Sequence, residues 1–323
     1  MKVAVYSARK YDTDALTRAN EAEGNPHALV FHDIQLTPNT VRVAEGSEAV
    51  CVFVNDDVGR ETLRLMSDMG IRAVATRSAG RNHIDAEAAD ELGIEVRSVP
   101  AYSPHGVAEY AVALMLTLNR KIHRAFNRVR EGNFALDGLL GFDMHGKTVG
   151  VVGTGLIGAC VCRILLGMGC RVLAYDVRAQ QSLERAGVVY MPLEEMLPQC
   201  DILTLHCPLL DATRNLIDAE AIERMPDHAM LINTSRGGLM DTGAAYAALR
   251  AGRLGSLGID VYEEESELFF EDRSDTGLTD ELLARLVALP QALVTGHQAF
   301  FTSEALEKIA EITIRNLSDM AGR

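Results

Sequence analysis

Short runs of apolar residues alternate with longer segments of helical period along most of the chain, and this rhythm indicates βαβ units around parallel sheets. In the first hundred residues the strand-like runs lie at 2–7, 49–54, 73–77 and 94–99. A second series opens at 148–152 with TVGVV and closes at 292–296 with ALVTG. The pattern therefore predicts an α/β fold with two open parallel sheets.

A turn and a long apolar helix separate the two series. Residues 100–106 read PAYSPHG, a turn with two prolines, and residues 107–132 carry helical periodicity over an unusual length. At the C-terminus, residues 303–320 also have apolar residues at helical spacing, and a helix there is expected to pack on the first domain. We therefore expect one domain from residues 1–101 plus 299–323 and another from residues 102–298.

Length and charge narrow the class of protein. A chain of 323 residues is long enough for two domains, and 48% hydrophobic with 24% charged residues is an ordinary globular composition. The chain has 31 Lys and Arg against 45 Asp and Glu, a net charge of −14, and no basic cluster that would follow a phosphate backbone. Neither nucleic acids nor anionic membranes are expected partners.

The N-terminus and the cysteines indicate the compartment. Residues 1–12 lack the apolar core of a signal peptide, and no apolar run approaches the roughly 20 residues that a membrane helix requires. We therefore expect a cytoplasmic protein. The six cysteines lack the spacing of a zinc site or a disulfide framework. We expect reduced core thiols, and no metal, at Cys51, Cys160, Cys162, Cys170, Cys200 and Cys207.

A glycine-rich loop after the strand TVGVV predicts a dinucleotide site. Gly153, Gly155 and Gly158 are spaced as GxGxxG between that strand and a helical segment, with Thr154, Leu156 and Ile157 between them. The glycines allow a tight turn, a close approach to pyrophosphate and close packing of helix on strand. Asp176 ends the next strand, where a carboxylate would accept hydrogen bonds from the adenosine ribose. This favours NAD over NADP, although Arg178 leaves tolerance of NADPH open.

Polar residues follow three further strands of the same series, at the edge where open α/β sheets bind ligands. They are Arg236, then Asp260 with Glu265 five residues on, and His297. Arginine can hold a carboxylate with two hydrogen bonds, and histidine can exchange a proton with a substrate oxygen. An acidic partner would fix the imidazole tautomer. Together these groups suit the reduction of a 2-keto acid, but spacing alone does not choose among Glu263, Glu264 and Glu265.

The motifs around these residues resemble those of the D-isomer-specific 2-hydroxyacid dehydrogenase family, and within it the fermentative D-lactate dehydrogenases of bacteria. The resemblance covers essentially the whole chain through VGVVGTGLIG, CDILTLHCPLLDATRNLI, MLINTSRGGLMD, GIDVYEEE and VTGHQAF. It implies a flavodoxin-like substrate domain and a doubly wound NAD domain, both Rossmann-like, with an active-site cleft between them.

The resemblance also implies roles for individual residues. Arg236 would bind the substrate carboxylate and polarise its carbonyl, His297 would be the general acid/base with Glu265 as its partner, and Asp260 would contact the nicotinamide end of NAD. We also expect substrate contacts from Ser78, Ala79, Gly80, Tyr102, Arg9, Phe53 and Phe300. Further cofactor contacts are expected from His206, Cys207, Pro208, Thr234 and Ser235, although His206 could equally satisfy a backbone carbonyl.

The implied reaction is the reversible NADH-dependent reduction of pyruvate to D-lactate. The alternatives are another 2-keto acid, such as phenylpyruvate, hydroxypyruvate or glyoxylate, or an NAD-sensing binding protein like the C-terminal-binding corepressors. The partner is then a small 2-keto or 2-hydroxy acid. We expect a homo-oligomer, a dimer or a tetramer, with the long helix beginning near Gly106 as its candidate surface.

Overall fold

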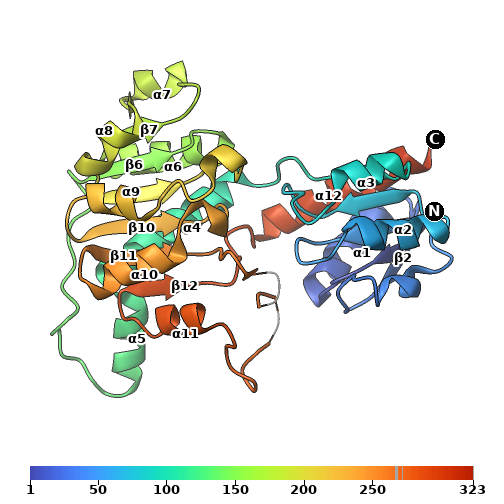
Figure 1. The fold of residues 1–323 in the computed structure, drawn as a ribbon, viewed down its shortest axis with the longest axis horizontal. Coiled ribbons are helices and arrows are strands. Elements are labelled where there is room, and N and C mark those ends of the chain that lie inside the picture. The colour runs from blue at the N-terminus through green and yellow to red at the C-terminus, as the bar shows by residue number, and fades with distance from the viewer. Residues whose placement is uncertain (266–267, 271, 323) are drawn as a thin grey trace. The chain divides into compact units, whose positions relative to one another are not determined.

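A computed structural model describes residues 1–265, 268–270 and 272–322, and the chain divides into two compact units (Figure 1). Unit 1 comprises Met1–Ser103 and Phe301–Arg323, and unit 2 comprises Pro104–Phe300. The chain leaves unit 1 once and returns to it with its last helix. The boundaries expected from the sequence lie two residues earlier at both crossings.

The described residues of unit 1 form a five-stranded parallel sheet in the order β2-β1-β3-β4-β5. This order is that of flavodoxin-like sheets, in which strand order reverses beside the first strand. The strands are β1 (Lys2–Val5), β2 (Ala28–Phe31), β3 (Ala49–Val52), β4 (Ala73–Thr76) and β5 (Glu95–Arg97). The helices are α1 (Lys10–Ala22), α2 (Arg60–Asp68), α3 (Ala86–Glu91) and α12 (Ser303–Ala321), with a 3₁₀ turn η1 (Val41–Ala44).

Two apolar clusters cover the two faces of this sheet, because successive strand residues point to opposite sides. Val50, Val52 and Val74 join one cluster, whereas Cys51 and Ala75 join the other. The second cluster is completed from the C-terminus, since α12 contributes Ala310, Ile314, Leu317 and Met320 to it. The C-terminal helix is therefore part of the core of the N-terminal unit.

The residues of unit 2 that the structure describes form a seven-stranded parallel sheet in the order β12-β11-β10-β9-β6-β7-β8, which is the doubly wound order with one added strand. The strands are β6 (Thr148–Val152), β7 (Arg171–Tyr175), β8 (Val189–Tyr190), β9 (Ile202–Leu205), β10 (Ala229–Asn233), β11 (Leu254–Ile259) and β12 (Ala292–Val294). Its helices are α4 (Pro104–Arg120), α5 (Ile122–Arg130), α6 (Leu156–Gly167), α7 (Gln181–Ala186), α8 (Leu193–Met196), α9 (Ala219–Arg224), α10 (Thr242–Arg250) and α11 (Glu281–Val287). The 3₁₀ turns named in its described part are η2 (Leu197–Gln199), η3 (Asp211–Thr213) and η4 (Gly237–Leu239).

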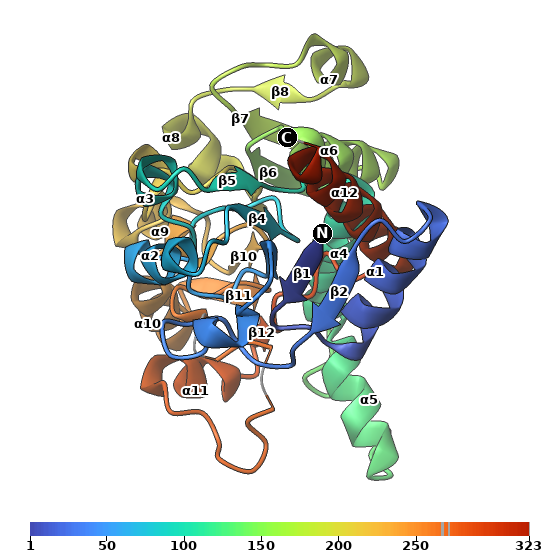
Figure 2. The same ribbon diagram turned by 90° about the vertical axis from the view of Figure 1, so that its right-hand side faces the viewer.

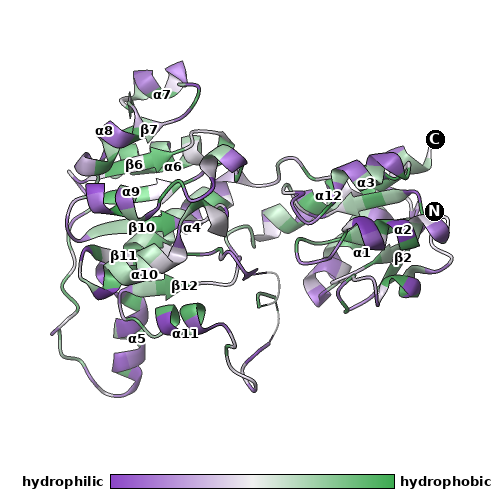
Figure 3. Cartoon of the chain, viewed as in Figure 1, coloured by the Kyte–Doolittle hydropathy of each residue, from purple (hydrophilic) through white to green (hydrophobic). Residues whose placement is uncertain are grey.

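The central strands of both sheets are largely apolar, as Figure 3 shows by colour, and the predicted α/β fold is confirmed. In unit 2, α4 and α6 share one apolar cluster with the sheet, and α9 and α10 share the other. Among the described residues, no helix is long and apolar enough to cross a membrane. All six cysteines are free thiols, and five of them are buried.

The prediction of one long helix over residues 107–132 is wrong in one respect, because this segment forms two helices. Lys121 separates α4 from α5 with a left-handed backbone, φ 49°. The apolar residues of α4 pack within unit 2, whereas α5 has no buried residue. Figure 2 shows α5 extending away from the sheet of its unit. The exposed apolar surface of this region is therefore on α5 and the loop after it, and not along α4.

Candidate active site

The glycine-rich loop joins β6 to α6 in unit 2 with the geometry that a dinucleotide site requires. Gly153 adopts φ 88°, and a Cβ atom on Gly158 would overlap the carbonyl oxygen of Gly153. Gly155 is the N-cap of α6 and has open space where a side chain would stand. No side chain caps this helix start, so its N–H groups and positive dipole end are available to an anion.

Asp176, at the end of the neighbouring strand β7, is held by the same loop. Its Oδ2 accepts hydrogen bonds from the Thr154 backbone N–H at 2.6 Å and the Thr154 hydroxyl at 3.1 Å, and its Oδ1 accepts from Arg178 N–H at 3.0 Å. Burial works against the charged form, but these hydrogen bonds outweigh it and lower the pKa of Asp176. The carboxylate is therefore charged and fixed beside the loop, as recognition of a ribose requires.

The other residues of the glycine-rich loop have distinct surroundings. The Thr154 hydroxyl also accepts a hydrogen bond from the Tyr190 hydroxyl at 2.9 Å, so this buried threonine braces Asp176. Leu156 is exposed, and Ile157 packs against the core beneath α6. The sequence analysis missed Tyr190, because a tyrosine on a two-residue edge strand carries no motif.

The loops after β9 and β10 bring five further predicted cofactor residues to this sheet edge, since both strands lie in register with their neighbours. His206 contacts the Thr204 hydroxyl through Nε2 at 2.8 Å, and burial lowers its pKa to about 3. The Ser235 hydroxyl donates to the Cys207 carbonyl oxygen at 2.7 Å and so ties the two loops together. Pro208, one residue on, is exposed.

Thr234 carries an observation that points to a ligand. It is 7% exposed, and its hydroxyl has no hydrogen-bond partner among the described residues. A buried hydroxyl without a partner costs free energy unless something else satisfies it. Together with the open space at Gly155 and the uncapped start of α6, this shows that the residues present fit a bound dinucleotide.

Arg236 follows β10 and lies half-buried at the start of η4. Its carbonyl oxygen accepts a hydrogen bond from the Asn233 side chain at 2.8 Å, and its Nη1 donates to the Ser235 carbonyl oxygen at 2.6 Å. The next residue, Gly237, approaches the backbone of Tyr262 so closely that a Cβ atom would overlap it. The arginine loop is thus pressed against the segment that follows β11.

Glu265 belongs to that segment, and it is the glutamate that contacts His297. The distance from Glu265 Oε1 to His297 Nδ1 is 2.9 Å, and Glu265 Oε2 accepts from the Tyr262 backbone N–H at 2.9 Å. Glu263 instead accepts hydrogen bonds from Thr242. The side chains of His297 and Glu265 are 16% and 21% exposed. Because Nδ1 is engaged, Nε2 is the ring nitrogen left to exchange a proton with a ligand.

Asp260 holds the turn that carries the histidine. It is fully buried, and it accepts hydrogen bonds from the Thr295 hydroxyl at 2.5 Å and from Gln298 and Ala299 N–H at 3.0 and 2.7 Å. Burial raises the pKa of Asp260, although these hydrogen bonds oppose the shift. His297 donates its own N–H to the Asp260 carbonyl oxygen and adopts a left-handed φ of 52°. The contact of Asp260 with the nicotinamide stays a prediction.

The predicted substrate residues of unit 1 follow neighbouring strands of its own sheet. Arg9 comes after β1 and pairs with Asp33 at 2.5 Å, and Phe53 comes directly after β3. Ser78 comes after β4, where its hydroxyl donates to the Gly80 carbonyl oxygen at 2.8 Å around Ala79. Tyr102 lies near the end of this unit, and the buried Phe300 ends unit 2. Their roles toward a substrate stay predictions.

Comparisons with known proteins agree with this geometry. Residues 112–299 match the family model described as "D-isomer specific 2-hydroxyacid dehydrogenase, NAD binding domain". The chain is 48% identical to the D-lactate dehydrogenase of Escherichia coli over 320 residues, which cover 99% of this chain and 97% of that protein.

Solved structures match the whole fold. The apo-structure of Escherichia coli D-lactate dehydrogenase aligns with a TM-score of 0.91 at 45% identity and covers 100% of this chain and 97% of that one. The pyruvate reductase of Chlamydomonas reinhardtii aligns with a TM-score of 0.93 at 42% identity, over 99% of this chain and 96% of that one. The chain therefore belongs to the D-isomer-specific 2-hydroxyacid dehydrogenase family and is an NAD-dependent oxidoreductase.

Proposed function

We propose that this enzyme reduces pyruvate to D-lactate with NADH and catalyses the reverse oxidation. The observation that carries the proposal is the His297–Glu265 pair at 2.9 Å, because it joins a proton donor to the sheet edge that carries Arg236 and the glycine-rich loop. Similar proteins named D-lactate dehydrogenase and pyruvate reductase support the choice of substrate.

NADH, when bound, supplies the hydride that reaches the carbonyl carbon. Gly153, Gly155 and Asp176 would hold its adenosine and pyrophosphate parts, and Thr234 offers an unsatisfied hydroxyl to it. Asp260 keeps the turn around His297 in place and is expected to lie near the nicotinamide.

The protein residues bind the keto acid and move its proton. Arg236 holds the carboxylate of pyruvate with its planar fork and draws electrons from the carbonyl oxygen. His297 donates the Nε2 proton to that oxygen as the carbonyl group becomes an alcohol, and the imidazole becomes neutral. Glu265 stabilises the imidazolium before the transfer and keeps Nδ1 protonated after it. In lactate oxidation the same proton returns to Nε2.

The preference for a small substrate is attributed to aromatic residues. We propose that Phe53 and Phe300 narrow the site toward a methyl group, and that Tyr102 and Arg9 contact the substrate. The backbone of Ser78, Ala79 and Gly80 would add hydrogen bonds to the carboxylate. The apolar bulk of Phe53 and Phe300 and the loop positions of the other residues support these roles. Keto acids larger than pyruvate are expected to react more slowly.

We also propose that the enzyme is a cytoplasmic homo-oligomer, either a dimer or a tetramer. Free cysteines are typical of a reducing compartment. The assembly surface is the arm formed by α5 and residues 131–143. Its apolar side chains are exposed, Phe134 by 74%, Leu136 by 80% and Leu140 by 87%. Such a large apolar patch is unusual on a monomer.

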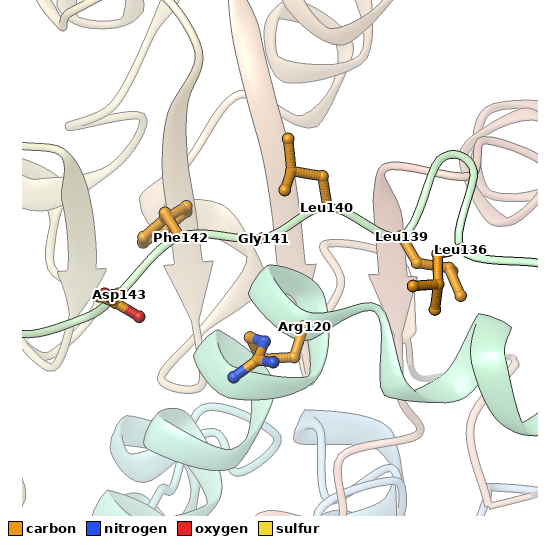
Figure 4. Close-up of a pocket in the computed structure, with 7 residues that line it drawn as sticks. All are labelled: Arg120, Leu136, Leu139, Leu140, Gly141, Phe142 and Asp143. Atoms are coloured by element: carbon orange, nitrogen blue, oxygen red, sulfur yellow. The ribbon is translucent and has the colours of Figure 1, made fainter.

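A second copy of the chain is the occupant that fits this arm. With Ile122, Phe126 and Val129, the exposed side chains of the arm offer on the order of 800 Å² of surface, given the roughly 150–250 Å² of an aromatic side chain. One partner buries about that area in a standard interface. A pocket of about 470 Å³ lies on the same arm, lined by Arg120, Leu139 and Phe142 among others. Figure 4 shows the lining side chains. Protruding residues and a pocket on one patch suit a two-fold contact.

The proposed activity is tested by following NADH oxidation with pyruvate, with phenylpyruvate, hydroxypyruvate and glyoxylate as competing substrates, and by assaying the lactate enantiomer. We expect preference for pyruvate and formation of D-lactate. The variant His297→Gln is expected to bind NADH and to lose most turnover. Binding of NADH with no turnover of any keto acid would favour an NAD-sensing protein, and normal turnover by His297→Gln would exclude the proton-transfer role.

A further inference from the structure

A buried guanidinium lies at the ligand-binding edge of the unit 1 sheet. Arg77 directly follows β4 and is 1% exposed, which makes it the largest fully buried side chain described in the protein. It also directly precedes Ser78, the first residue of the loop assigned to the substrate carboxylate. The reaction proposed above gives this arginine no part.

The Arg77 side chain connects the ends of three strands. Its Nη2 donates to the carbonyl oxygens of Tyr6 at 3.0 Å and Ser7 at 3.1 Å, where the chain leaves β1. Its guanidinium carbon lies 5.5 Å from the centre of the Phe53 ring, just after β3, within the range of a cation–π contact. Since Arg77 itself follows β4, one cation holds the exits of β1, β3 and β4.

Two buried carboxylates extend this network to the predicted substrate residues. Asp12 lies 3.6 Å from Arg77 Nε and accepts a hydrogen bond from the Arg9 backbone N–H at 3.1 Å. Asp56 accepts from the Ser7 hydroxyl at 2.7 Å and from the Phe53 backbone N–H at 2.6 Å. Asp12 therefore connects the backbone of Arg9 to the Arg77 guanidinium. Phe53 is held by Asp56 through its backbone and by Arg77 through its ring.

The backbone at Ser7 shows what this network enforces. Ser7 adopts φ 47°, a left-handed conformation that residues other than glycine rarely take. Its carbonyl oxygen is held by Arg77 and its hydroxyl by Asp56. Strained backbone of this kind persists only where surrounding contacts fix it, and it concentrates at functional sites.

Stability alone does not explain a charge in this position. Nη1 of Arg77 is buried and has no hydrogen-bond partner among the described residues. A buried cation with unused donors is generally less favourable than an apolar side chain of the same volume. The fixed geometry of the three loops is what the guanidinium provides that an apolar residue would not.

We propose that Arg77 is a positioning residue for the substrate site, and that it sets the relative places of Arg9, Phe53 and the Ser78–Gly80 loop. The inference rests on the proposed function, because it assumes that these residues meet the keto acid. Arg77 acts through them and does not itself contact the reacting atoms.

The test compares Arg77→Met, Arg77→Lys and Asp12→Asn with the parent enzyme and with Leu63→Val, a buried control in the same unit. For Arg77→Met we expect the KM for pyruvate to rise about tenfold or more with a much smaller change in kcat. Arg77→Lys keeps the charge but not the fork and is expected to fall between Met and the parent. Asp12→Asn should change KM in the same direction. The dissociation constant of NADH should not change, since its predicted residues belong to unit 2.

Thermal unfolding separates positioning from simple stability. Leu63→Val should lower Tm and leave the KM for pyruvate unchanged, whereas the Arg77 variants should change KM at temperatures where they remain folded. If Arg77→Lys and Asp12→Asn lower Tm and keep the parent KM, Arg77 is only structural and the inference is overturned. Arg77→Lys and Asp12→Asn decide the matter if Arg77→Met does not fold. A parent enzyme that does not reduce pyruvate would instead refute the proposed function.

Discussion

The contact between Glu265 and His297 makes a sharp prediction for Glu265→Gln. Both carboxylate oxygens accept hydrogen bonds, Oε1 from His297 Nδ1 and Oε2 from the Tyr262 backbone N–H, each at 2.9 Å. Glutamine has the same shape but only one acceptor oxygen. Its NH₂ group must therefore face one of the two donors, whichever way the amide is turned. The variant loses a charge and also gains a clash between donors.

The size of the effect follows from the nature of this hydrogen bond. A bond to a charged partner is worth about 1.5–3 kcal/mol, and the two side chains are 16% and 21% exposed, so solvent screens the pair only partly. Losing that stabilisation of the imidazolium lowers the rate of pyruvate reduction by about 10- to 150-fold, at about 1.4 kcal/mol per tenfold. Binding of NADH is expected to stay unchanged.

The assay is NADH oxidation with saturating pyruvate, with NADH affinity measured separately by fluorescence. The matched control is Glu264→Gln, which removes one charge from an exposed neighbour. Turnover within about twofold of the control would refute the role of the carboxylate, because a lost hydrogen bond to an ion costs more than that.

Four further predictions concern other parts of the molecule. Arg236→Lys should lower kcat/KM for pyruvate, because one point charge does not reproduce a planar fork, and an unchanged value would exclude that role. Asp176→Asn should shift cofactor preference from NADH toward NADPH by about tenfold, the effect of one neighbouring charge, as measured by the ratio of kcat/KM values. Burial lowers the pKa of His206 from 6.5 to about 3. Below pH 6.5 the unfolded chain therefore binds a proton at His206 that the folded protein does not bind. Stability should fall by about 3 kcal/mol between pH 6.5 and about pH 4, and His206→Gln should flatten this slope in urea titrations. Leu140→Asp should dissociate the oligomer in sedimentation experiments without loss of folding, whereas an intact oligomer would place the interface elsewhere.

The repeated strand pattern was enough to predict most of the fold, because buried parallel strands leave short apolar runs in the sequence that few other structures produce. The strand β2 was missed for the opposite reason. Its residues Ala28–Phe31 alternate between exposed and half-buried at the edge of the sheet. The break at Lys121 was missed because a left-handed lysine has no sequence signal, and packing around it decides its conformation.

The candidate site divides in a similar way. The glycine-rich loop could be predicted, since each glycine meets a local geometric need at a fixed spacing. Spacing alone could not choose Glu265 among three consecutive glutamates, because the choice depends on how residues 263–265 leave β11, and only the family resemblance assigned it. Arg77 and Asp56 gave no signal either, since most of their partners lie 20 or more residues away in the sequence.

The return of α12 to unit 1 has a consequence for biosynthesis. The ribosome completes residues 1–103 before unit 2, but one apolar face of their sheet is covered only in part by α1, and the remaining cover comes from α12, which is synthesised after unit 2. Unit 2 is continuous in sequence and can fold as soon as it emerges. The first segment made is thus the last to reach its native state, and a nascent chain stalled before residue 303 would present to chaperones a β-sheet with one face covered only by α1.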